Sequence, residues 1–77
     1  MTAAARTLDA KGLSCPLPVL KARRVMQEMK PGEVLEVLAT DPAAPKDFVN
    51  FCEVGGHAML ASTEAGGVFT MHIRKAG

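Results

Sequence analysis

The stretch PGEVLEVLATDP, residues 31–42, places a Val- and Leu-rich segment between two chain breakers. Pro-Gly and Asp-Pro dipeptides mark turns, and the apolar segment between them predicts a β-strand over residues 33–40. Because successive side chains of a strand point to opposite faces, Leu35, Val37 and Ala39 are expected to face the core. The alternate positions of the strand would face the other way.

A helix is predicted on each side of this strand. Upstream, apolar residues recur at helical spacing from Val19 to Met29, and Pro18 suits a first helical turn, where its missing N–H costs nothing. Downstream, Asp41 is a candidate cap for a second helix that ends at Gly55-Gly56. Three residues of the second helix share one face: Phe48, Phe51 and Cys52.

Three further strands complete the prediction. Residues 6–10 form a short first strand with Leu8 pointing inward, and residues 57–63 and 68–75 form a hairpin through a Gly-containing turn. Strands connected through helices prefer parallel pairing, whereas hairpin strands pair antiparallel. We therefore expect an α/β (α+β) two-layer sandwich of order β-α-β-α-β-β, with a mixed four-stranded sheet and both helices on one face.

The composition restricts the function. A chain of 77 residues predicts a single domain, here residues 6–75 behind a flexible tail of residues 1–5. With no Trp or Tyr, aliphatic residues and five Met must fill the core, which leaves little room for a deep substrate pocket. The net charge of +1 lacks the basic excess of a nucleic-acid-binding protein, so no direct nucleic-acid binding is expected.

Targeting and cofactor motifs do not occur in the sequence. The N-terminus lacks the apolar segment of a signal peptide, and no apolar run has the length needed to cross a bilayer. We therefore expect a cytoplasmic protein without membrane contact, in a compartment where thiols stay reduced. Without a Gly-rich phosphate loop or a cluster of metal ligands, no metal or organic cofactor is expected.

Cys15 is the residue that points to chemistry, because it lies where a loop meets the start of a predicted helix. Backbone N–H groups and the helix dipole would stabilise a thiolate there, which predicts a lowered pKa and a reactive sulfur. Pro16 and Pro18 would stiffen the segment and hold the sulfur outward. An alternative stays open at this point, since a lone cysteine in a small domain is often a buried, inert side chain.

The segment LDAKGLSCPLPVLKA, residues 8–22, closely resembles the signature of the TusA/SirA-like sulfur carriers, and the resemblance extends from about residue 6 to residue 75. It implies the same β-α-β-α-β-β sandwich. It also implies a sulfurtransferase that works only with partner proteins. Cys15 would accept sulfane sulfur as a persulfide from a cysteine desulfurase or a rhodanese-like donor and pass it to an acceptor protein. Pro16 and Pro18 match the prolines of the family motif.

The sequence departs from the tRNA-thiolation members of that family at two positions. Those members carry Arg before the cysteine and Glu between the prolines, where this chain has Ser14 and Leu17. Leu17 makes the surface beside the thiol apolar, which suits a different docking partner. The resemblance therefore leaves three pathways open: tRNA thiolation, molybdenum-cofactor maturation and dissimilatory sulfur metabolism.

Four residues of the first helix are candidates for partner docking: Leu17, Lys21, Arg23 and Arg24. Basic side chains there would attract acidic partner surfaces, although they equally suit an ordinary solvated face. Lys21 and Arg24 would also add positive charge near Cys15. We expect a monomer, with Val34 and Leu38 on the outer sheet face as a candidate patch for a weak dimer.

No chemical role is predicted for three further residues. Cys52 shares an apolar stripe and is expected to pack in the core, although a resolving disulfide with Cys15 is an alternative. His57 follows a helix stop and is expected to cap carbonyl groups or contact water. His72 is expected on the polar face of the sheet, without the acid partner or second ligand that catalysis needs.

Two other functions compete with the sulfur carrier. In one, the protein is a non-catalytic interaction or regulatory module in which Cys15 is structural. In the other, Cys15 is a redox-sensing thiol that forms sulfenic acid or a mixed disulfide. Persulfide formation on Cys15 distinguishes the carrier from both.

Overall fold

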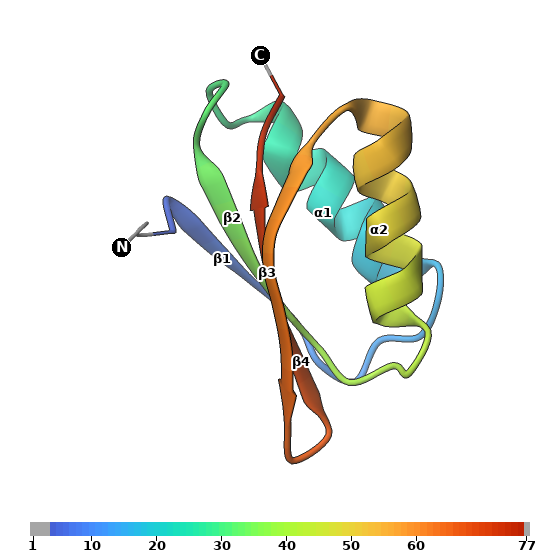
Figure 1. Ribbon diagram of the computed structural model, residues 1–77. Helices are drawn as coiled ribbons and strands as arrows, with labels where there is room; N and C mark the ends of the chain where they lie inside the picture. Colours follow the sequence, from blue (N-terminus) through green and yellow to red (C-terminus); the bar gives the residue numbers. More distant parts are fainter. Residues whose placement is uncertain (1–3, 77) are drawn as a thin grey trace.

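The computed structural model describes residues 4–76, so most of the predicted tail, residues 1–3, lies outside the described part. Its elements follow the predicted order β-α-β-α-β-β (Figure 1). Their bounds are β1 Arg6–Ala10, α1 Leu17–Gln27, β2 Val34–Ala39, α2 Ala44–Gly55, β3 Ala58–Ala65 and β4 Val68–Arg74.

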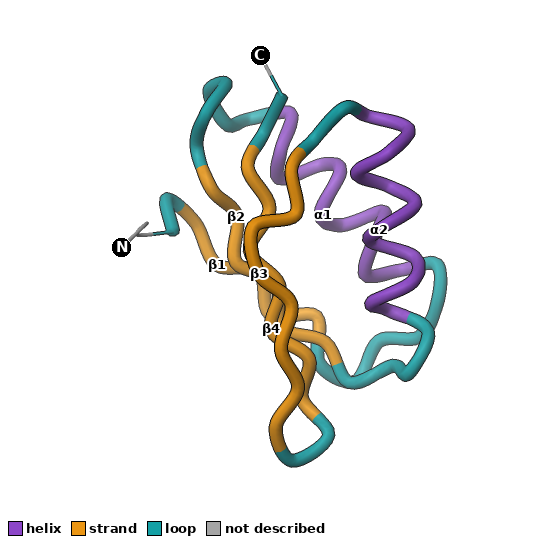
Figure 2. The backbone as a smooth tube through the Cα atoms, viewed as in Figure 1, coloured by secondary structure: helices purple, strands orange, loops and turns teal. Residues whose placement is uncertain are grey.

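The four strands form one mixed sheet in the order β1-β2-β4-β3. β1 pairs parallel with β2, placing Leu8 beside Val37, and β4 pairs antiparallel with both β2 and β3. Both helices cover the same face of this sheet (Figures 1 and 2), which confirms the predicted two-layer sandwich. The sheet face opposite the helices holds the hydrogen-bonded pair Glu36 and His72, as expected for His72.

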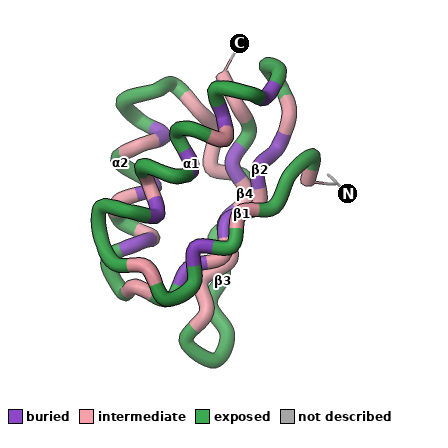
Figure 3. Tube along the Cα trace, turned by 180° about the vertical axis from the view of Figure 1, so that it is seen from behind, coloured by how far each residue is buried: buried purple, intermediate pink, exposed green. Residues whose placement is uncertain are grey.

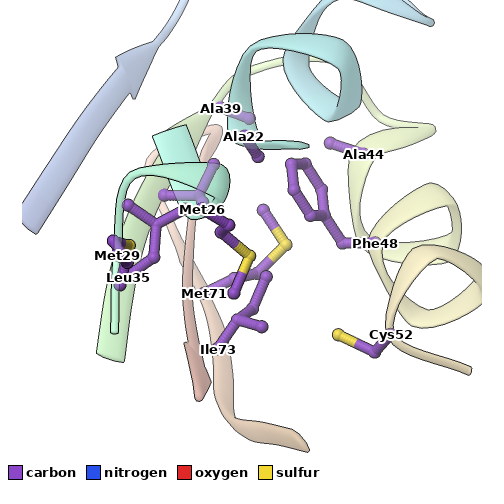
Figure 4. Packing of buried hydrophobic residues seen from close by; sticks show 11 residues of the cluster. Ala22, Met26, Met29, Leu35, Ala39, Ala44, Phe48, Cys52, Met71 and Ile73 are labelled. Atoms are coloured by element: carbon purple, nitrogen blue, oxygen red, sulfur yellow. The ribbon is translucent and has the colours of Figure 1, made fainter. Parts of the chain in front are cut away.

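The core lies between the sheet and the helices (Figures 3 and 4). Leu35, Val37 and Ala39 of β2 are fully buried, as predicted from their alternation. They meet Met71 and Ile73 from β4 and Phe48 from α2, all completely buried. Aliphatic and Met side chains therefore fill the core in place of Trp and Tyr, which the sequence lacks.

Glycine residues end α2 and form the hairpin turn. Gly56 adopts a left-handed conformation, with φ 73°, directly after α2, as the predicted stop requires. Gly66 and Gly67 also have positive φ angles of 59° and 82°, the combination that a type I′ hairpin turn needs. These backbone angles favour glycine because a side chain would make them costly.

The predicted dimer patch is wrong at Val34. This residue begins the central strand β2, and its relative exposure is only 3%. The segment before β1 runs beside it, where the Ala5 N–H donates to the Val34 carbonyl at 2.8 Å, and Arg74 of β4 is its register partner on the other side. Neighbouring chain on both sides thus covers Val34, and half-buried Leu38 alone makes no patch.

Between residues 4 and 76, the two helices are each too short to span a membrane.

Candidate functional site

Cys15 is exposed in the loop between β1 and α1. Parallel β1 and β2 end side by side, with Ala10 paired to Ala39, so the loops that follow these strands meet at one edge of the sheet. The side chain of Thr40 accepts a hydrogen bond from the Gly12 N–H at 2.9 Å. The loop after β2 therefore holds the loop that carries the thiol.

Asp41 makes the second link between these loops. Its carboxylate accepts the Cys15 N–H at 2.6 Å and the Ala43 N–H at 3.0 Å. These two hydrogen bonds, the Ala43 bond first, hold the pKa of the Asp41 carboxyl below its ordinary value of 3.8. Asp41 was predicted to cap α2, but the helix begins at Ala44, so Ala43 occupies the cap position and the Asp41 carboxylate binds backbone N–H groups of both loops instead.

The start of α1 offers few free N–H groups to the thiol. Pro16 occupies the N-cap position and Pro18 lies in the first turn, and neither residue has an N–H. The Leu17 N–H donates to the Ser14 carbonyl at 2.9 Å. The prolines that hold the segment in place thus remove donors that would stabilise a thiolate.

Two carboxylates dominate the charge around Cys15. The pKa of Cys15 is raised above its ordinary value of 9.0, first by the neighbouring Asp47 carboxylate, then by desolvation, and least by the charge of Asp41. The lowered pKa predicted from the helix start is therefore wrong. Prediction failed here because the nearest charges come from the loop after β2 and from α2, which are distant in sequence.

A hollow of about 300 Å³ opens beside the thiol, between α1 and α2. It is lined by Cys15, Pro16, Val19, Asp47, Asn50, Phe51 and Val54. Leu17, the departure noted between the two prolines, is 45% exposed. The surface around the thiol is therefore mostly apolar, with one carboxylate in the lining.

The structure distributes the predicted docking residues over two sides of α1. Lys21 and Arg24 line a separate hollow on the β1 side, together with Leu8. Arg23 lines another on the α2 side, with His57 and Lys75. The charges that shift the pKa of Cys15 are those of Asp47 and Asp41, so the positive contribution expected from Lys21 and Arg24 is not found.

Cys52 packs in the core, as predicted, with 5% exposure (Figure 4). Burial raises the pKa of its thiol above the ordinary value. Both cysteines are free, so the structure holds no Cys15–Cys52 disulfide. Of the two thiols in the chain, Cys15 is the one that a partner protein can reach.

His57 caps a carbonyl group as predicted, through its backbone N–H, which donates to the Cys52 carbonyl at 2.9 Å. Its Nδ1 accepts the Ala76 N–H at 2.9 Å, and its ring lies 5.2 Å from that of Phe51. Burial, assisted by the charge of Lys75, lowers the pKa of His57 below 6.5. The ring in addition fastens Ala76 to the end of α2, a contact that the sequence did not predict.

Among residues 4–76, no group of three or more His, Cys, Asp or Glu side chains has an arrangement that would hold a metal ion.

Comparison with known proteins gives concordant similarities. The model of the family described as sulfurtransferase TusA matches residues 6–75. A putative sulfur carrier protein of Neisseria meningitidis serogroup A is 50% identical over 68 residues, covering 88% of this chain and 92% of that protein. Sulfur carrier protein TusA of Allochromatium vinosum is 47% identical, with 88% and 90% covered. The solved structure of a SirA-like protein from Desulfitobacterium hafniense superposes with a TM-score of 0.82, at 26% identity over 94% of this chain and 99% of that one.

Proposed function

The chain belongs to the TusA family of sulfurtransferases, and from this premise we propose that Cys15 is the residue on which it carries sulfur. The protein is a sulfur carrier, as its relatives are. The observation that supports Cys15 is the contrast between the two thiols. Cys15 is exposed beside a hollow, whereas Cys52 is buried in the core.

The proposed chemistry is a pair of sulfane-sulfur exchanges. The Cys15 thiolate attacks the outer sulfur of a donor persulfide, the donor's S–S bond breaks, and the donor cysteine leaves as a thiolate. An acceptor thiolate then attacks the outer sulfur of the Cys15 persulfide, and Cys15 leaves as a thiolate. Each step breaks one S–S bond and forms another, so neither needs an external oxidant, a metal or an organic cofactor.

Two features of the site support the proposal: the exposure of the Cys15 thiol and the apolar lining of the hollow beside it. A partner's sulfur-bearing loop has to bring its sulfur into contact with Cys15, which requires an exposed thiol on a well-held loop. The hydrogen bonds from Gly12 to Thr40 and from Cys15 to Asp41 fix that loop. The apolar hollow beside the thiol, with exposed Leu17 at the motif, suits a protein donor such as a cysteine desulfurase or a rhodanese-like enzyme.

Persulfide formation is tested by intact-mass measurement after incubation with a cysteine desulfurase and cysteine. We expect wild type to gain the mass of one sulfur atom and to lose it on treatment with a reductant. Cys15→Ser should gain none. Cys52→Ala, with its folding checked by circular dichroism, should still be loaded.

Three results would contradict the proposal. Sulfur addition that persists in Cys15→Ser would place the carrier thiol elsewhere. Absence of addition to wild type, with both a desulfurase and a rhodanese-like donor, would favour a non-catalytic interaction module. Oxygen addition to Cys15 under peroxide without any sulfur loading would favour the redox sensor.

A further inference from the structure

The charge around Cys15 is negative, although thiol chemistry needs an anion at that place. Asp47 lies in the first turn of α2, and its carboxylate lines the same hollow as the Cys15 thiol. Asp41 accepts the backbone N–H of the same cysteine. Asp47 is the one charged residue in the lining of that hollow. The site therefore opposes formation of the nucleophile that sulfur exchange uses.

Such an arrangement makes the resting thiol less reactive toward small oxidants and electrophiles, because the thiolate is the nucleophilic form. Sulfur exchange then requires something that relieves the repulsion. Within the lining of the hollow no cation does so. A positive charge beside Asp47 would have to come from the molecule that exchanges sulfur with Cys15.

We propose that Asp47 restrains the resting Cys15 thiol, and that a cationic side chain next to the partner's reactive sulfur releases it by pairing with the Asp47 carboxylate. This inference rests on the proposed function for its biological meaning. The partner it fits is a protein whose sulfur-bearing loop carries a Lys or Arg close to the sulfur, with an apolar residue to fill the hollow at Phe51 and Val54.

The release can be written as balanced steps. The partner's cation donates a hydrogen bond to Asp47 and offsets the negative charge beside the thiol. The thiol then loses its proton to water, and the new thiolate attacks the partner's outer sulfur. The partner's S–S bond breaks, and its cysteine leaves as a thiolate that takes up a proton from water. Asp47 neither takes up nor gives up a proton in these steps, so its proposed role is electrostatic and not that of a proton carrier.

Small disulfides of opposite charge test the proposal without an identified partner. Cystamine carries an ammonium group near each sulfur, and dithiodipropionate carries a carboxylate. We measure the rates of thiol–disulfide exchange at Cys15, by peptide mass spectrometry, for wild type and Asp47→Asn. For each protein, the rate with cystamine divided by the rate with dithiodipropionate gives its charge preference. Dividing the charge preference of wild type by that of the variant cancels the intrinsic reactivity of each reagent.

The rate ratio of cystamine to dithiodipropionate should be roughly threefold larger in wild type than in Asp47→Asn. This is the size of effect expected for one partly exposed ion pair. Alkylation by neutral iodoacetamide near neutral pH should be faster in Asp47→Asn, because the pKa of Cys15 falls when the neighbouring charge is removed. Glu53→Gln is the matched control, since it removes an exposed carboxylate from the same helix and should change neither rate.

An unchanged charge preference in Asp47→Asn, or an equal change in Glu53→Gln, would overturn the inference. Slower alkylation in Asp47→Asn would overturn it as well. Sulfur loading in the desulfurase experiment reports on the proposed function separately. Wild type that fails to load but shows the Asp47-dependent charge preference would refute the carrier role of Cys15 and leave the restraint standing.

Discussion

His57 and Gly55 illustrate how one missing side chain permits a contact. The His57 ring is held by the Ala76 N–H and lies against Phe51. A methyl group at Gly55 would lie 2.7 Å from two atoms of that ring, which is closer than atoms can approach. Gly55 is therefore needed for the close packing of the ring against the end of α2, and the neighbouring Gly56 is needed for its left-handed backbone.

Gly55→Ala should destabilise the protein. Overpacking costs about 1 to 3 kcal/mol, whereas replacing a helical glycine by alanine gains about 1 kcal/mol, so we expect a net loss of about 1 kcal/mol. Urea unfolding measures this loss. In a His57→Ala background the same substitution should cost nothing or stabilise. A full loss that persists without the ring would exclude the contact as its cause.

Asp47 is the second residue whose role depends on a neighbour from another element. Its position in the first turn of α2 is ordinary, because negative charge is favourable at a helix N-terminus. Its place beside Cys15 gives this carboxylate a further effect, since it raises the pKa of the cysteine. A residue suited to its own helix thus controls the reactivity of a side chain on another loop.

At the scale of the elements, the parallel pair β1 and β2 creates the site. Parallel neighbours end at the same edge of a sheet, so the loops that leave them lie together and become a common place for functional residues. Here the first loop supplies Cys15, and the second supplies Thr40 and Asp41, which accept its hydrogen bonds. An antiparallel pairing of β1 and β2 would put these loops at opposite ends.

A row of polar side chains connects β1, β2 and β4 on the sheet face opposite the helices. Glu36 of β2 is the register partner of both Thr7 on β1 and His72 on β4. It accepts a hydrogen bond from Thr7 at 3.2 Å and is paired with His72 at 2.9 Å. These contacts, the His72 pair first, lower the pKa of Glu36 below 4.5.

Glu36→Gln should weaken this row by a small amount. Cross-strand pairs contribute about 0.2 to 1 kcal/mol each, and the side chains of Glu36 and His72 are 30% exposed, so we expect a total loss of about 0.5 to 1 kcal/mol. Urea unfolding near pH 6 measures it. Glu53→Gln on α2 serves as the control. Equal stabilities of the Glu36 variant and wild type would show that water replaces these contacts at no cost.

For the molecule as a whole, the dependence of stability on pH is predicted from the five groups among residues 4–76 whose pKa values are shifted. The folded state lowers the pKa of Glu36, Asp41 and His57. Their contributions are complete above the ordinary values of 4.5, 3.8 and 6.5 and decrease as pH falls below them. The pKa values of Cys15 and Cys52 are raised, so their contributions are complete below 9.0 and decrease as pH rises above it.

The urea midpoint of unfolding should therefore be highest between the ordinary pKa values of His57, 6.5, and of the thiols, 9.0. Measurements from pH 4 to 10 under reducing conditions test this. His57→Gln should flatten the first part of the acid decrease, near pH 6. A midpoint that rises on acidification from pH 6.5 would contradict the lowered pKa of His57.

The elements, their order and the position of the thiol can be predicted from local patterns in the sequence. These features depend on residues that are close in the sequence, so they can be recognised without the tertiary structure. They are the alternation in β2, the helical spacing in α1 and α2, and the turn residues Gly56, Gly66 and Gly67. The burial of Cys52 followed from its place on an apolar stripe. The motif at Cys15 also carried the family resemblance that the comparisons bear out.

The electrostatics of the site could not be predicted in this way, because folding brings the charges together. Asp41 and Asp47 are 26 and 32 positions after Cys15 in the chain, and parallel pairing of β1 with β2 and packing of α2 against α1 bring them to the thiol. Val34 was likewise misassigned, because its cover comes from Ala5 and β4. The physical reason is that charge acts through space, so the pKa of a side chain depends on neighbours that only folding assembles.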